Sequence, residues 1–319
     1  MKNLLTPLWV VLLVVSCSKE KADETNNGNK NENRLKATTL SVPSQYSTIQ
    51  AAINAANSGD VINIANGTYN EIVNIPSTKS NIKIIGASQT GVILTASGTT
   101  QTTLTVDGSD ITFETMTIRQ TAGQTAGNTN HAVRVNGARV EFYKCYLYGW
   151  QDTFCIYNNA LVYCNLCEIR GSVDFIYGDR PAFFQSCNIR QMRVSNPAGG
   201  VNAAPNHASN VRGFVFSGCT ICRASGVPDN SSTLMRPWGA NGETAYINCS
   251  MDSHISAAGW SIWSTATPNT SACRAAEYGS KTLSGTAINL STRSSWVTRL
   301  TSTSNYTRSA ILGSWTPPL

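Results

Sequence analysis

The sequence predicts an all-β protein built as a parallel β-helix, a solenoid of stacked coils, with a short helix capping its N-terminal end. Three features predict this fold: one helical segment, a series of short β-rich segments after it, and a Cys-containing segment that recurs along the chain. The recurrence is clearest in the nearly equal spacings of Cys145, Cys167 and Cys187. A period of about 22 residues is typical of β-solenoid coils, each of which buries an inward stripe against its neighbours.

The helix is expected at the start of the folded region, where residues 47–50 read Ser-Thr-Ile-Gln, a capping-box pattern. Four apolar residues share one helical face: Ile49, Ala52, Ile53 and Ala56. Gly59 is expected to end the helix. Short β-rich segments separated by Gly, Asn, Ser and Thr follow at residues 61–64, 82–85, 91–94 and 104–106.

The recurring segment begins with aromatic or aliphatic residues, passes through a Cys and ends with Ile or Leu. It is found at residues 141–147, 161–169, 183–189 and 214–221. In a parallel β-helix, equivalent residues of successive coils lie about 4.8 Å apart, so these side chains should form ladders. A β-sandwich also contains many short strands, but it does not predict such a period.

Composition excludes several classes of protein. Only 13% of the 319 residues are charged and 41% are apolar, which rules out a disordered polyelectrolyte. The net charge is +6, but no segment is dense in Lys or Arg. This distribution argues against a nucleic-acid partner and is compatible with an acidic substrate.

Residues 1–16 are predicted to be a lipoprotein signal peptide. Lys2 precedes an apolar run from Leu4 to Val15, which suits a signal sequence and is too short to cross a bilayer as a helix. The run ends in Val-Val-Ser-Cys, which resembles a bacterial lipobox with Cys17 as the lipidated residue. Soluble export, with Cys17 incidental, is the alternative.

Residues 17–40 are predicted to be the lipidated Cys and a flexible tether. After Cys17 the segment is rich in Lys, Glu, Asn and Thr and has almost no apolar content, so it cannot form a core. Ser18 directly after the lipidated Cys indicates the bacterial outer membrane, with the domain facing the periplasm or the cell surface. The folded β-helix domain is expected from residue 41 to 319.

The cysteines permit three interpretations. Cys164-x-x-Cys167 and Cys219-x-x-Cys222 look like halves of a zinc site, but they are far apart in the sequence, and positions i and i+3 of a strand face opposite sides. We therefore predict no metal site and expect most cysteines to be buried thiols. Because an exported protein can form disulfides, Cys167 and Cys187 on adjacent coils are the predicted pair.

The chemistry predicted from the residues alone depends on carboxylates. The chain has no Gly-x-Ser-x-Gly, no phosphate-binding Gly-rich loop and no His-x-x-x-His, and its three histidines are far apart. Asp152 and Asp174 are separated by one coil of the period found above. Two acids so close would have split pKa values, giving one ionised group and one proton donor. A pair of loop-capping aspartates is the alternative.

Several motifs in sequence order resemble a known family. Residues 149–154 read Gly-Trp-Gln-Asp-Thr-Phe, residues 171–178 read Gly-Ser-Val-Asp-Phe-Ile-Tyr-Gly, and residues 234–238 read Leu-Met-Arg-Pro-Trp. They resemble Gly-Tyr-Gln-Asp-Thr-Leu, Gly-Thr-Val-Asp-Phe-Ile-Phe-Gly and Leu-Gly-Arg-Pro-Trp of the pectin methylesterases, which are carbohydrate esterases with a right-handed parallel β-helix. The resemblance covers residues 41 to about 300 and implies that this β-helix is also right-handed.

The resemblance implies a role for each acid. Asp174 would be the nucleophile that attacks the ester carbonyl of a methylated galacturonate. Asp152 would protonate the departing methanol and then activate water against the acyl-enzyme. Gln151 would donate a hydrogen bond to the oxyanion.

The resemblance also implies supporting residues. Arg236 would hold Asp174 ionised and oriented through its planar guanidinium. Aromatic surface for sugar rings would come from Trp238, Trp150 and Tyr177. The alternatives are that Arg236 pairs with a carboxylate only for stability and that Trp238 belongs to the core.

The chain departs from the family pattern at several positions. His131 stands where the family has a Gln that is a second oxyanion donor, and residues 201–205 read Val-Asn-Ala-Ala-Pro where the family has Val-Thr-Ala-Gln-Gly. Tyr177 replaces Phe and Met235 replaces Gly. We expect His131 to donate an N–H to the oxyanion and to titrate near its ordinary pKa of about 6.5. The alternative is that it packs on the coil.

The sequence therefore predicts a lipid-anchored, monomeric esterase that removes methyl esters from pectin without a metal or other cofactor. An esterase or thioesterase acting on another acyl substrate is one alternative, and a carbohydrate-binding β-helix without turnover is another. A lyase is disfavoured because we see no cluster of exposed acids for the calcium that such enzymes commonly need.

Overall fold

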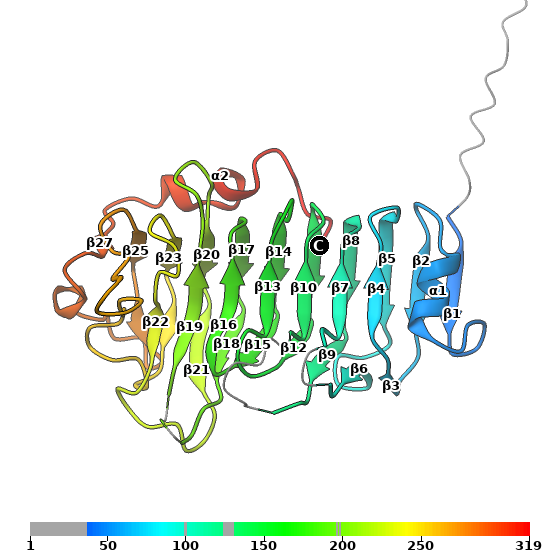
Figure 1. The fold of residues 1–319 in the computed structure, drawn as a ribbon, viewed down its shortest axis with the longest axis horizontal. Helices are drawn as coiled ribbons and strands as arrows, with labels where there is room; N and C mark the ends of the chain where they lie inside the picture. The colour runs from blue at the N-terminus through cyan, green and yellow to red at the C-terminus, as the bar shows by residue number, and fades with distance from the viewer. Residues whose placement is uncertain (1–36, 99–100, 124–130, 196, 198) are drawn as a thin grey trace, which may run out of the picture. The chain divides into compact units, whose positions relative to one another are not determined.

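The coils of the protein stack so that successive turns of the chain add strands to three parallel sheets (Figure 1). This computed structural model describes residues 37–98, 101–123, 131–195, 197 and 199–319. The predicted signal peptide, Cys17 and most of the tether lie outside the described residues. Within the described residues, none of the helices is both long and apolar enough to cross a bilayer.

The three sheets are called A, B and C, and each joins strands from successive coils. Sheet A contains β1 (Thr39–Val42), β2 (Val61–Ile64), β5 (Ser80–Gly86), β8 (Ser109–Glu114), β11 (Val140–Tyr143), β14 (Val162–Asn165), β17 (Ala182–Gln185), β20 (Phe214–Ser217), β23 (Glu243–Ile247), β25 (Arg274–Tyr278) and β27 (Thr298–Arg299). Sheet B contains β3 (Gly67–Asn70), β6 (Val92–Ala96), β9 (Thr117–Gln120), β12 (Tyr146–Tyr148), β15 (Glu168–Gly171), β18 (Asn188–Gln191), β21 (Thr220–Arg223), β24 (Ser250–Met251) and β26 (Lys281–Thr282). Sheet C contains β4 (Val73–Ile75), β7 (Leu104–Val106), β10 (Val133–Val135), β13 (Phe154–Ile156), β16 (Val173–Gly178), β19 (Val201–Pro205) and β22 (Thr233–Met235).

The parallel register confirms the coil period read from the sequence. Val140 of β11 pairs with Val162 of β14, which pairs with Ala182 of β17. The steps between these partners equal the spacings of the three cysteines that predicted the repeat. The inward side chains of all three sheets form one continuous buried core.

The N-terminal cap is the predicted helix, α1 (Ile49–Ala55), but its capping differs from the prediction. Thr48, rather than Ser47, is the N-cap, and its side chain accepts from the N–H of Ala51 (3.0 Å). Glu71 caps the N–H groups of Ile49 and Gln50 at 2.9 and 3.1 Å, so the Gln50 side chain is not needed for a capping box. The folded region also starts slightly before the predicted boundary, because β1 begins at Thr39.

A buried ladder of cysteines follows sheet A, as the repeat predicts. Each cysteine comes directly after a corner residue with left-handed backbone, such as Leu166 (φ 55°) or Ser186 (φ 51°). This corner turns the chain from sheet A into sheet B. The cysteines at this corner are Cys145, Cys167, Cys187, Cys219 and Cys249, and all are buried.

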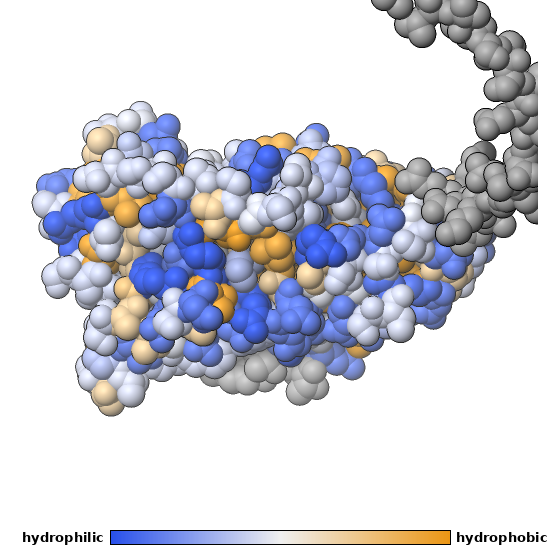
Figure 2. Space-filling view, turned by 90° about the horizontal axis from the view of Figure 1, so that it is seen from above, coloured by the Kyte–Doolittle hydropathy of each residue, from blue (hydrophilic) through white to orange (hydrophobic). Residues whose placement is uncertain are grey.

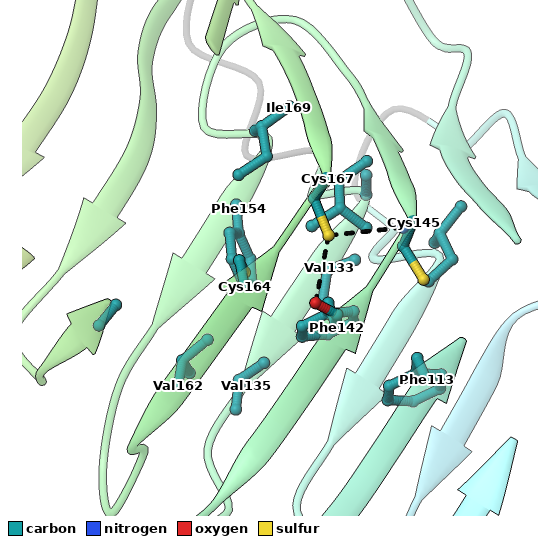
Figure 3. Packing of buried hydrophobic residues seen from close by; sticks show 14 of the residues in the cluster. Phe113, Val133, Val135, Phe142, Cys145, Phe154, Val162, Cys164, Cys167 and Ile169 are labelled. Atoms are coloured by element: carbon teal, nitrogen blue, oxygen red, sulfur yellow. Dashed lines mark hydrogen bonds between the residues drawn. The ribbon is translucent and has the colours of Figure 1, made fainter. Parts of the chain in front are cut away.

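The predicted disulfide between Cys167 and Cys187 is wrong in this structure, because both are free thiols. The Sγ of Cys167 donates to the carbonyl of Phe142 in the preceding coil at 3.2 Å (Figure 3). Cys187 donates in the same way to the carbonyl of Cys164 at 3.5 Å. The stacked thiols therefore donate to backbone carbonyls and also contact the thiols of neighbouring coils, without a covalent bond between them. A disulfide requires the two Cβ–S bonds to converge, which this repeated orientation does not provide.

The C-terminal segment covers the outward face of sheet A. It includes η1 (Leu290–Thr292), η2 (Ser304–Tyr306) and α2 (Arg308–Leu312), and it returns along sheet A towards earlier coils (Figure 1). Ile311 and Leu312 pack against outward side chains of sheet A, including Tyr163. From the side that carries α2, the surface is mostly hydrophilic with apolar residues in small groups (Figure 2).

Candidate active site

The two predicted acids occupy equivalent positions of successive coils, where the chain turns into sheet C. Asp174 is the second residue of β16, and Asp152 precedes the neighbouring strand β13. The N–H of Asp152 donates to the carbonyl of Val173 at 3.2 Å. Both aspartates have left-handed backbone, with φ of 55° and 50°, a conformation in which Asp is enriched among non-glycine residues. The one-coil spacing therefore places the acids side by side.

Asp174 is fixed by an arginine from two strands away. Arg236 follows β22 directly and donates twice to the Asp174 carboxylate, from Nε to Oδ1 at 2.9 Å and from Nη2 to Oδ2 at 2.6 Å. The intervening strand β19 contributes only the small side chain of Ala204 to the cleft. The pairing of β16 with β19 is irregular between Val173 and Ile176, so Asp174 lies in a local bulge. The predicted contact of Arg236 with Asp174 is present.

The surroundings of Asp174 and Asp152 affect the pKa values of the two carboxyl groups differently. Asp174 is 6% exposed, and burial raises its pKa, while the two bonds and the positive charge of Arg236 limit that rise. Burial and the neighbouring charge of Asp174 raise the pKa of Asp152 to about 7, with Arg236 and Gln151 opposing the rise. Near neutral pH the arrangement therefore favours an ionised Asp174 beside an Asp152 that can carry a proton.

The acids lie at the floor of a cleft of about 230 Å³. It is lined by Gln151, Asp152, Asp174, Tyr177, Ala204, Arg236, Trp238 and Trp263. Trp238 is 38% exposed, so the alternative that it belongs to the core is wrong. Its ring centroid lies 6.0 Å from that of Tyr177 and 6.3 Å from that of Trp263. These three rings form an aromatic wall of the kind that suits the apolar face of a sugar.

Trp263 is a cleft residue that the sequence did not assign to the site. The Arg236 guanidinium lies 4.5 Å from its ring centroid, a cation–π contact that gives the arginine a second partner besides Asp174. The signal in the sequence is weak, because Trp260 lies close by in the chain and looks equivalent. Trp260 is buried and donates from Nε1 to Glu277 (3.2 Å), so it belongs to the core.

Two predicted site residues are not among those that line the cleft. Trp150 directly precedes Gln151 in the chain but does not contribute to the lining. His131 is 5% exposed, and its Nε2 is hydrogen-bonded to the hydroxyl of Tyr177 rather than directed into the cleft. Burial and the charge of Arg134 lower the pKa of His131 to about 4, so in this environment we no longer expect His131 to titrate near 6.5.

Across the described ranges, no group of three or more His, Cys, Asp or Glu side chains is placed to hold a metal ion.

The fold and the cleft define a class of protein: a parallel β-helix that presents paired carboxylates and an arginine on the outward face of one sheet. The family model for Pectinesterase matches residues 39–313, and the chain belongs to the pectinesterase family.

Individual proteins show the same relationship. Pectinesterase 2 from Citrus sinensis is 34% identical over 235 residues, and the match covers 68% of this chain and 44% of that protein. This chain thus spans less than half the length of that relative. The structure of the pectin methylesterase from carrot matches with a TM-score of 0.79 at 26% identity, covering 88% of this chain and 94% of that one. A pectin methylesterase from Erwinia chrysanthemi matches with a TM-score of 0.75 at 28% identity, covering 89% and 98%. These matches confirm the right-handed parallel β-helix.

Proposed function

We propose that this protein hydrolyses the methyl esters of galacturonate units in pectin, giving pectate and methanol. The observation that carries the proposal is the pair of neighbouring acids in one cleft, of which Asp174 alone is held by Arg236. Membership of the pectinesterase family supports the same reaction. The aromatic wall of the cleft suits a polysaccharide substrate.

In the first step, a carboxylate oxygen of Asp174 attacks the ester carbonyl carbon. The carbonyl electrons move onto oxygen, and Gln151, which lines the cleft, donates a hydrogen bond to that oxyanion. When the carbonyl re-forms, the bond to methoxide breaks, and the proton of Asp152 passes to the leaving oxygen. The products are methanol, an acyl-Asp174 anhydride and an ionised Asp152.

In the second step, Asp152 removes a proton from water as the water oxygen attacks the sugar-side carbonyl of the anhydride. Collapse of this intermediate releases the sugar carboxyl group as the free acid and restores the Asp174 carboxylate and the protonated Asp152. The released galacturonic acid then loses its proton to solvent. Atoms and charge therefore balance over the cycle. Arg236 stabilises the Asp174 carboxylate both before attack and as the leaving group of the second step.

Methanol release from highly methylated pectin tests the proposal. Asp174→Asn should lower turnover by several orders of magnitude, because an amide cannot form the anhydride. Asp110 provides a matched control: it also has left-handed backbone (φ 58°) and is paired through two bonds with an arginine, Arg139, but it lies on sheet A. Asp110→Asn should keep wild-type turnover.

The outcome also separates the two alternatives. Turnover of other acyl esters without methanol release from pectin would identify a different acyl substrate. Binding of pectin without turnover of any ester would identify a carbohydrate-binding protein. Either result would contradict the proposed reaction.

We also propose that the protein is a monomeric lipoprotein of the bacterial outer membrane, anchored through Cys17. The support is the lipobox-like sequence that ends at Cys17 and the polar segment after it. Acyl chains would hold the domain at the membrane without a membrane-spanning helix. Cys17→Ser should move the protein from the detergent phase to the aqueous phase with unchanged methanol release, and retention in the detergent phase would contradict the anchor. Sedimentation of the released protein tests the monomer.

A further inference from the structure

Two positions at which the sequence departs from the family pattern, His131 and Tyr177, are in direct contact. The Nε2 of His131 is hydrogen-bonded to the Tyr177 hydroxyl, and its Nδ1 is hydrogen-bonded to the hydroxyl of Thr102 at 3.0 Å. The two rings are also stacked, with centroids 5.6 Å apart and planes 16° from parallel. The side chains of Thr102, His131 and Tyr177, which come from separate coils, thus form one hydrogen-bonded network.

In this hydrogen-bonded network, both ring nitrogens of His131 have a partner. His131 and Tyr177 are 5% and 9% exposed, so neither can readily exchange its partner for water. A neutral imidazole has one donor and one acceptor nitrogen, and here each has one hydroxyl partner. Breaking either contact would leave a ring nitrogen of the buried His131 without a hydrogen bond, which is costly.

Tyr177, at one end of the network of Thr102, His131 and Tyr177, belongs to the cleft that holds the two acids. Tyr177 lines the cleft together with Asp152 and Asp174. Its direct neighbours along the outward face of sheet C are Cys155 on β13 and Ala204 on β19, both small side chains. Besides His131, the rings near it in the described part of the chain are Tyr157, edge-on at 5.6 Å, and Trp238, tilted at 6.0 Å. These small neighbours constrain the Tyr177 ring only weakly by packing, so the position of its hydroxyl depends on the hydrogen bonds to His131 and to the Cys155 thiol.

We propose that His131 is a positioning residue that holds Tyr177 as a fixed wall of the cleft against the galacturonate ring. The inference rests on the proposed function, since it assigns the wall to the substrate of that same site. A ring wall contacts the sugar equally before and during the reaction. Its loss therefore raises KM while leaving kcat nearly unchanged.

A double-mutant cycle with His131→Leu, Tyr177→Phe and the double variant tests the inference. With pectin as substrate, each single variant should raise KM by about 3- to 10-fold, the effect of losing one hydrogen bond, and change kcat by less than about twofold. The double variant should resemble a single variant, because both partners of the bond are then apolar. His131→Gln, which keeps a donor and an acceptor, should recover part of the lost affinity.

His254 provides the matched control. It is a fully buried histidine whose pKa burial lowers to about 4, it is outside the cleft lining, and neither ring nitrogen is hydrogen-bonded within the described part of the chain. His254→Leu should leave KM and kcat unchanged. A KM increase in His254→Leu equal to that in His131→Leu would show a general effect of losing a buried histidine and would overturn the inference.

Other outcomes also overturn it. A fall in kcat of about 10²- to 10³-fold in His131→Leu with unchanged KM would make His131 a direct oxyanion donor. Unchanged kinetics would show that the position of Tyr177 does not depend on His131. Multiplicative effects in the double variant would show that the two residues act independently. If wild type released no methanol, the proposed function would fail instead. Binding of polygalacturonate to the four proteins of the cycle, namely wild type, His131→Leu, Tyr177→Phe and the double variant, would then test the positioning role without turnover. Equal affinities would reject that role.

Discussion

Two pairs of side chains in this protein are separated by one coil, and they have opposite chemical properties. Asp152 and Asp174 lie on successive coils at the entrance to sheet C, and Cys167 and Cys187 lie on successive coils at the exit from sheet A. The acids lie in a cleft beside Arg236, whereas the thiols are buried and donate to backbone carbonyls. The solenoid makes any such pair adjacent, and the side of the sheet that the pair faces decides its chemistry.

The comparison explains why one pair was predicted correctly and the other was not. Two carboxylates need only proximity to perturb each other, because the electrostatic interaction acts over several ångströms. Two thiols need a specific relative orientation to form a bond. The coil period guarantees proximity but also gives successive side chains the same orientation, which favours the first kind of pair over the second.

The largest expected effect comes from removing the arginine that distinguishes the acids. Arg236→Gln should lower kcat/KM for pectin by about 10²-fold or more, because an unpaired buried Asp174 would hold its proton more tightly. Its activity should recover as the pH is raised, since Asp174 must then lose that proton. Arg236→Lys keeps the positive charge but lacks the planar guanidinium. Its kcat/KM should therefore lie between those of wild type and Arg236→Gln. An Arg236→Gln protein with wild-type activity at pH 6 would show that Asp174 needs no partner.

The raised pKa of Asp152 predicts a pH-dependent rate. Asp152 must be protonated to give methanol its proton, and burial raises its pKa to about 7. Acylation should therefore be fastest below pH 7 and should fall about tenfold per pH unit above it, until another step limits the rate. Single-turnover rates from pH 5 to 9 measure this limb. Asp152→Asn should remove it, and an identical limb in that variant would assign the titration to another group.

The thiol pair should affect stability rather than catalysis. Cys187→Ala removes one buried sulfur atom from the ladder and should lower the free energy of unfolding by about 1–2 kcal/mol. Methanol release by the folded protein should be unchanged, because the corner of sheet A is not part of the cleft. Denaturant unfolding and turnover on the same preparation measure both quantities. A loss of turnover without a loss of stability would contradict the contrast between the two pairs.

The smallest expected effect concerns the number of thiols, which should not change when the protein is treated with a reductant. Thiol counting of the denatured protein should give the same value with and without reductant, because the nine cysteines in the described residues are free. Two extra thiols after reduction would restore the disulfide predicted from the sequence. Cys167→Ser and Cys187→Ser would then show whether these residues form it.

The sequence by itself determined the coil period, the capping helix, the buried ladder and the acid pair. It did so because a solenoid converts separation along the chain into distance in space, so that residues one coil apart become neighbours. The motifs around Asp152, Asp174 and Arg236 then indicated the family and the role of each group. Arg236 is 62 residues from Asp174, and only the family motif could connect them from the sequence.

Only the tertiary structure decided how side chains are oriented within each coil. The left-handed corners at Leu166 and Ser186 direct the thiols towards carbonyls, a choice that residue type does not reveal. His131 bonds to Tyr177, and Trp263 rather than Trp260 reaches the cleft, because strands on neighbouring coils bring together segments with no shared local pattern. Period fixes which residues are neighbours, whereas backbone angles and burial fix what those neighbours do.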